Sequence, residues 1–169
     1  MLSTVRLRYV RPIVLLITIL SLSLPAISQA RTTITQQEAS ARSAQISDVS
    51  YTLFFKLDEK NERYSGNTEI NFQLNPGSDQ DSTFVDFHEG KVLALSINGK
   101  NHSDFIYKDD RIILPYEKLS KGKNHISIKF ERQFNTNGRG LHRFKDPVDG
   151  NVYIYSQHEP YSARETFPC

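Results

Sequence analysis

A glutamine and a glutamate two residues apart, Gln157 and Glu159, have the types and spacing that could bind a ligand. They follow the apolar run Val152–Tyr155 and precede Pro160, which favours an extended conformation at Glu159. Residues i and i+2 of an extended chain lie on the same side, so we expect both side chains to project together while His158 points the other way. A carboxylate beside an amide can hold an ammonium group. An ordinary solvated strand end is the alternative.

No other set of residues in the chain has the spacing of a catalytic site. An HExxH zinc motif is absent, because Val92 follows His88-Glu89 and Ser162 follows His158-Glu159 where a second histidine would stand. Cys169 lacks an assigned base and is interpreted as a small apolar residue. The acidic side chains with the strongest claim to acid/base chemistry are interpreted as turn residues on a solvated edge: Asp86, Glu89, Asp109 and Asp110. The sequence therefore predicts no catalytic residue and no metal ligand.

The residues around the Gln157–Glu159 pair belong to a longer pattern, which includes Gly140-Leu141-His142-Arg143-Phe144, Asp146-Pro147, Gln157, Glu159-Pro160, Ala163-Arg164 and Phe167-Pro168-Cys169. This pattern resembles the end of the N-terminal domain of zinc aminopeptidases related to aminopeptidase N. A GLHRF-like hairpin precedes a QxEPxxARxxFPCFDxP signature in that family. The resemblance extends from about Ser47 to Cys169, and its strand motifs are less specific than its last part.

The resemblance implies roles for both polar side chains. Glu159 would help bind the free α-amino group of a peptide, and Gln157 would line the pocket for the first side chain. A complete family member would contain one zinc ion and release N-terminal amino acids, with the peptide N-terminus as its partner. The family pattern continues past the cysteine, so we expect an N-terminal domain cut off before its catalytic domain, or one that joins a separate catalytic chain. Two alternatives remain: a free-standing exported binding module and a non-functional partial reading frame.

The first 30 residues have the features of a secretory signal peptide. Arg6, Arg8 and Arg11 precede the apolar run 13–24, and small residues lead to a cleavage site near Ala30. This apolar run is too short for a stable membrane span, which needs about 20 residues. Cleavage would remove these three arginines and no acidic residue, so the formal net charge would fall from +2 to −1. We therefore expect no nucleic-acid partner. We expect export to the periplasm or the extracellular medium.

The elements that position the polar pair are predicted to be strands. Residues 31–47 form a short leader before these strands. Thr35 and Glu38 predict a helix start there, with the helix over 36–46.

Apolar residues then alternate with polar ones over 49–57, 66–74, 82–87, 92–97, 105–107, 111–114, 125–134, 141–144 and 152–155. Alternating aromatic residues are interpreted as core: Tyr51, Phe55, Phe72, Phe84, Tyr153 and Tyr155. The sequence predicts one all-β domain over 48–169, an antiparallel sandwich or saddle-like sheet.

Overall fold

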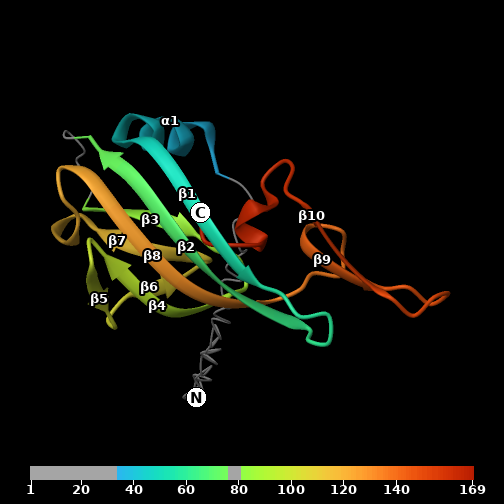
Figure 1. The fold of residues 1–169 in the computed structure, drawn as a ribbon. Helices are drawn as coiled ribbons and strands as arrows, with labels where there is room; N and C mark the ends of the chain where they lie inside the picture. Colours follow the sequence, from blue (N-terminus) through green and yellow to red (C-terminus); the bar gives the residue numbers. More distant parts are fainter. Residues whose placement is uncertain (1–33, 76–80) are drawn as a thin grey trace, which may run out of the picture.

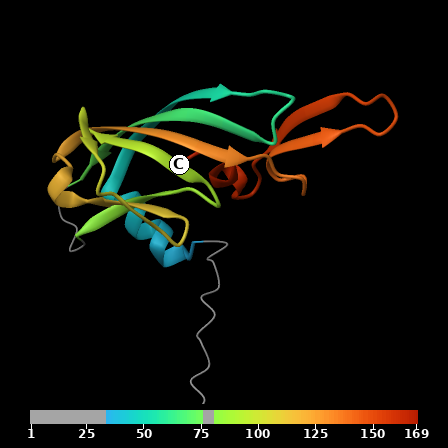
Figure 2. The ribbon, with the colours of Figure 1, turned by 90° about the horizontal axis from the view of Figure 1, so that it is seen from below.

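Two antiparallel sheets pack against each other to form the body of the protein (Figures 1 and 2). The computed structural model describes residues 34–75 and 81–169; the predicted signal peptide and its cleavage site near Ala30 lie outside this part. One sheet has the order β1-β2-β8-β4-β5 and the other the order β3-β7-β6. Their strands are β1 (Ile46–Lys56), β2 (Arg63–Leu74), β3 (Ser82–Asp86), β4 (Lys91–Ile97), β5 (Lys100–His102), β6 (Ile106–Lys108), β7 (Arg111–Pro115) and β8 (Gly122–Gln133). The predicted antiparallel all-β class is confirmed.

The helices are short and few in the described part of the chain. Helix α1 (Gln36–Gln45) begins where it was predicted, since the Thr35 side chain accepts a hydrogen bond of 3.1 Å from the backbone N–H of Glu38. The 3₁₀ turns η1 (Tyr116–Lys118) and η2 (Ser162–Glu165) complete the set. Within residues 34–75 and 81–169, no helix is long and apolar enough for a membrane crossing.

The core lies between the two sheets and is rich in aromatic rings. Strands β2 and β8 alternate buried and more exposed residues along their length, as a half-buried antiparallel strand does. The Phe130 ring is fully buried and contacts Phe87, Tyr64 and Phe55 at centroid distances of 5.3, 6.3 and 6.2 Å. A side chain at Gly66 would come within 2.6 Å of this ring, so glycine is required there.

Strand β1 is an edge strand, and its apolar face is only partly covered. It begins at Ile46, earlier than predicted, and its pairing with β2 shifts between Ser47 and Ser50. Phe55 packs against the core, but Tyr51 remains 44% exposed. An edge strand has a neighbour on one side only, so alternation in its sequence does not ensure burial.

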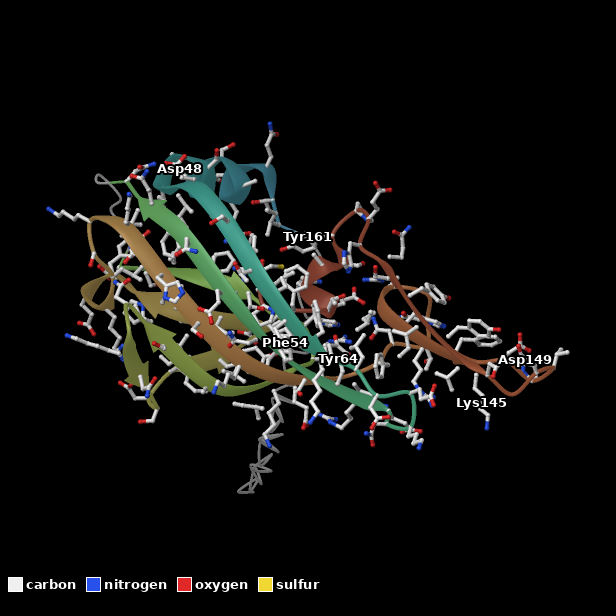
Figure 3. The ribbon with its side chains drawn as sticks, viewed as in Figure 1. Asp48, Phe54, Tyr64, Lys145, Asp149 and Tyr161 are labelled. Carbon is white, nitrogen blue, oxygen red and sulfur yellow. The ribbon has the colours of Figure 1, made fainter. Side chains whose placement is uncertain are left out.

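A third, two-stranded sheet projects from the body as an arm (Figures 1 and 2). It consists of β9 (Gly140–Lys145) and β10 (Val152–Gln157), and we call it the β9–β10 arm. Figure 3 shows Lys145 and Asp149 far out on the arm, away from the two larger sheets. The described end of the chain returns from the base of the arm to the body through η2.

Candidate functional site

The predicted ligand-binding pair lies at the base of the β9–β10 arm. Gln157 is the last residue of β10, where it pairs with Gly140, and Glu159 follows after one residue. Both side chains are exposed. The backbone N–H of Glu159 donates to Gln157 Oε1 at 3.5 Å. Among the described residues the Glu159 carboxylate has no hydrogen-bond or ion-pair partner, so its oxygens are available to a ligand.

His158 lies between the pair and is fixed by the body of the protein. Its Nε2 lies 3.1 Å from Thr166 Oγ1, and its ring meets the Phe167 ring edge-on with centroids 6.2 Å apart. Its carbonyl accepts a hydrogen bond of 2.7 Å from Ser162 N. The half-buried His158 thus contacts the protein while Gln157 and Glu159 face solvent, in agreement with the expected alternation.

The residues after the pair form a buried anchor, which we define as the Ser162–Cys169 segment. Pro168 and the side chains of Ser162, Arg164, Glu165 and Thr166 are all buried. Tyr64, in β2, donates a hydrogen bond of 2.8 Å from its hydroxyl to the Thr166 carbonyl. This segment therefore ties the base of the arm to the larger sheet.

Glu165 is the centre of this anchor, and no pattern in the sequence pointed to it. The side chain is 3% exposed and forms an ion pair with Arg139. Asn135 Nδ2 donates to Glu165 Oε2 at 3.0 Å, and Ser162 Oγ donates to Oε1 at 3.4 Å. A buried carboxylate is tolerated where charge and hydrogen bonds compensate its lost hydration.

Gly140 is required by the same anchor. Its φ is +62°, and a side chain at this position would come within 2.8 Å of the Glu165 backbone oxygen. Only glycine combines this left-handed conformation with so close an approach. Because Gly140 pairs with Gln157, the packing of Glu165 against Gly140 also fixes the end of β10.

A second buried carboxylate, Asp86, holds the described end of the chain. Its backbone exchanges two hydrogen bonds with Cys169, of 2.7 and 2.9 Å. Its side chain accepts hydrogen bonds from Arg111 Nε at 3.1 Å and from the Tyr161 hydroxyl at 2.8 Å. Two effects raise the pKa of Tyr161 to about 12: burial is the larger, and the hydrogen bond to Asp86 is the second. Figure 3 shows Tyr161 on the loop that leads from β10 to η2.

The interpretation of Asp86 as a turn residue on a solvated edge is therefore wrong, since it is 5% exposed. Asp110 is half-buried and lies 2.6 Å from His88 Nδ1 through its Oδ2. Glu89 and Asp109 are exposed turn residues, as expected. Both buried or half-buried acids find their partners far away in the sequence, and local composition cannot indicate such partners.

The aromatic residues that were assigned to the core divide into two groups. Phe72 is buried, Phe55 packs against the core, and Phe84 lies between the Arg42 and Arg111 guanidinium groups, 3.9 and 3.8 Å from its centroid. The assignment is wrong for Tyr51, Tyr153 and Tyr155, which are 44, 48 and 49% exposed. The two tyrosines of β10 lie on the arm, which has no second sheet to cover both of its faces.

The described residues do not fit a metal ion. Within residues 34–75 and 81–169, no group of three or more histidine, cysteine, aspartate or glutamate side chains could hold one. Burial raises the pKa of the Cys169 thiol to about 12, so it is a poor metal ligand and a poor nucleophile. The zinc that the family resemblance implies thus has no ligand set in this part of the chain.

Comparison with known proteins agrees with the signature in the sequence. The sequence profile of the family described as the peptidase M1 N-terminal domain matches residues 47–169. The chain is also similar to a protein named aminopeptidase N from Streptomyces lividans, with 31% identity over 139 residues. This match covers 80% of the chain and 16% of the relative, so the chain spans about a sixth of the relative's length.

Proposed function

This chain belongs to the peptidase M1 N-terminal domain family, and on that premise we propose that it anchors the substrate in an aminopeptidase that releases N-terminal amino acids. The observation that carries the proposal is the state of the Glu159 carboxylate. It is exposed and has no partner among the described residues, whereas the buried Glu165 in the same signature is fully occupied by Arg139, Asn135 and Ser162.

The proposed chemistry is recognition of the peptide N-terminus. The Glu159 carboxylate accepts charge-assisted hydrogen bonds from the α-ammonium group, which a peptide with a blocked amine cannot supply. Gln157 lines the pocket for the first side chain, where its amide both donates and accepts. The fixed His158 between them reduces the entropy that ligand binding costs, because the backbone is already ordered.

The catalytic groups are proposed to come from a partner. The described residues hold no metal-binding set, so the residues that cleave the peptide bond belong to a catalytic module, in the same polypeptide or in a separate chain. In our proposal this chain contributes Gln157 and Glu159 to a site that the module completes.

We also propose that the protein is exported. Support comes from the basic residues up to Arg11 and the apolar run 13–24. N-terminal sequencing of the exported protein should find a chain that begins near residue 31. An exported chain that keeps Met1 would contradict cleavage.

The anchoring role can be tested in a complete enzyme. We suggest replacing the matching part of the Streptomyces lividans relative with residues 47–169 of this chain, and then introducing Glu159→Gln. A charge-assisted hydrogen bond contributes about 1.5–3 kcal/mol, so kcat/KM for peptides with a free amine should fall about 10- to 100-fold. The matched control is Glu117→Gln in η1, which should leave kcat/KM unchanged. Equal kcat/KM values for Glu159→Gln and its parent would contradict the role.

A further inference from the structure

Glu159 is presented by a short loop between β10 and η2, which we call the 158–161 loop. Its carboxylate has no hydrogen-bond or ion-pair partner among the described residues, so the direction of the side chain depends on the backbone of the loop. The Ser162 N–H donates a hydrogen bond of 2.7 Å to the His158 carbonyl and closes the loop. The placement of Glu159 therefore depends on the contacts that hold the two ends of the loop.

The first end of the loop is held from the larger sheet. The His158 ring contacts Thr166 and Phe167, and the Thr166 carbonyl accepts a hydrogen bond of 2.8 Å from Tyr64 in β2. This connection fixes the residue before Glu159. A single attachment would let the rest of the loop turn about His158, so a fixed position of Glu159 requires a second one.

The second end of the loop is held from the smaller sheet. Tyr161 donates a hydrogen bond of 2.8 Å from its hydroxyl to Asp86 Oδ2, and its ring centroid lies 4.7 Å from the guanidinium carbon of Arg164. Because its pKa is raised to about 12, the Tyr161 hydroxyl keeps its proton at neutral pH and remains a donor. A hydrogen bond to a carboxylate is stronger than one between neutral groups.

Asp86 offers Tyr161 a rigid point of attachment. It is the last residue of β3 and is 5% exposed. Its Oδ1 accepts a hydrogen bond of 3.1 Å from Arg111 Nε, and Arg42 of α1 lies 3.6 Å from its Oδ2. Its backbone is hydrogen-bonded to Cys169 in both directions. The acceptor is thus held from several sides, and Tyr161 can transfer its position to the loop.

We propose that Tyr161, held by Asp86, is a positioning residue for the Glu159 carboxylate. It fixes the end of the 158–161 loop that His158 does not hold, so that Glu159 meets the α-ammonium group of a peptide at hydrogen-bond distance. This inference rests on the proposed function, because it takes Glu159 as the group that binds the substrate amine. Neither Tyr161 nor Asp86 contacts the substrate in this proposal.

A double-mutant cycle tests this role in a complete enzyme. The Streptomyces lividans aminopeptidase N would carry residues 34–169 of this chain, so that α1 and Arg42 are retained. Tyr161→Phe keeps the ring and removes the hydroxyl. Since a small displacement of a binding group is costly, kcat/KM for peptides with a free amine should fall about 10-fold. With Glu159→Gln already present, the same change should cost less than about 2-fold.

The cycle separates a positioning role from a structural one. A tyrosine that only stabilised the fold would lower kcat/KM by the same factor with and without Glu159→Gln. The matched control is Tyr107→Phe, which removes another half-buried hydroxyl, one that donates a hydrogen bond of 2.7 Å to the Phe87 carbonyl. This control should change kcat/KM by less than about 2-fold in either background.

The outcomes distinguish failure of the positioning role from failure of the proposed function. Two results would overturn the positioning role alone: a Tyr161→Phe variant with the kcat/KM of its parent, and equal losses with and without Glu159→Gln. An unchanged kcat/KM for Glu159→Gln by itself would overturn the proposed function, and the role of Tyr161 with it.

Amide hydrogen exchange in the full chain tests the loop without the joined enzyme. Tyr161→Phe should speed exchange of the Ser162 N–H about 10-fold, because the loop opens more easily without its bond to a carboxylate. The control is the Arg143 N–H, which donates a hydrogen bond of 3.0 Å to the Asn135 carbonyl and should change less than about 2-fold. Unchanged exchange at Ser162, or an equal rise at both amides, would contradict the assignment of Tyr161 to this loop.

Discussion

Two glutamates six residues apart show how differently one signature uses the same side chain. Glu159 is exposed and without a partner among the described residues, whereas Glu165 is 3% exposed and bound by Arg139, Asn135 and Ser162. The oxygens of an exposed carboxylate can accept hydrogen bonds from a ligand. The oxygens of a buried carboxylate must accept hydrogen bonds from the protein, because water no longer reaches them. The signature thus combines an anchor for the fold with an exposed pair, Gln157 and Glu159, which we call the presentation site.

Gly140→Ala should disturb the anchor around Glu165 and have the largest effect on stability. The new Cβ would require a left-handed conformation at φ +62° and would meet the Glu165 carbonyl at 2.8 Å. We expect the free energy of unfolding to fall by about 3 kcal/mol. Urea denaturation of the full chain measures this, with Gly150→Ala as the control, since that glycine also has positive φ (+74°) but nothing within 4 Å. Equal losses in the two variants would mean that the contact with Glu165 contributes nothing.

Glu165→Gln compared with Glu159→Gln tests the contrast itself. The Glu165 substitution removes the ion pair with Arg139 and puts an amide N–H₂ group in the place of an acceptor oxygen, so it should lower the free energy of unfolding by about 2 kcal/mol. The exposed one should stay within about 0.5 kcal/mol of the parent. The measurement is again urea denaturation. If both variants lost the same free energy, the division of the signature into anchor and presentation site would be wrong.

Alkaline pH should weaken the anchor and leave the presentation site unaffected. Burial raises the pKa of Tyr64 from 10.0 to about 12. The unfolded chain therefore ionises first, so this stability is fully present below pH 10 and is lost as pH rises through about 12. At about 1.4 kcal/mol per pKa unit, the loss attributable to Tyr64 is about 3 kcal/mol. Tyr161 and Cys169, whose pKa values are also raised to about 12, act in the same direction.

The control for the pH dependence is Tyr64→Phe. It loses the hydrogen bond to the Thr166 carbonyl, which should cost about 1 kcal/mol at pH 8. It should also flatten the dependence of the unfolding free energy on pH between 10 and 12, measured by denaturation in a pH series. An unchanged slope would show that Tyr64 does not carry the alkaline loss.

Local patterns were sufficient for many elements. The Thr35 cap begins α1 at Gln36, and Asn98 and Gly99 both have positive φ in the turn between β4 and β5. The pair Gln157 and Glu159 projects outward with His158 turned inward, as alternation predicts. These features depend on neighbours within a few residues, so the sequence contains the information they need.

The burial of single side chains could not be predicted in this way. Tyr153 and Tyr155 alternate like core residues but lie on an arm, and Asp86, which was interpreted as a turn residue, is the buried last residue of β3. Alternation specifies a strand and its two faces, not which sheet covers each face. That information depends on the pairing of distant segments.

Three features could be predicted from residue patterns alone: the antiparallel all-β class, the strand that ends at Gln157, and the signature of the peptidase M1 N-terminal domain family. Which carboxylates have arginine partners depends on the tertiary fold. Asp86 meets Arg111, and Glu165 meets Arg139, across 25 and 26 residues of sequence. Burial of a charge is favourable only where such partners converge, and their convergence is a property of the folded chain.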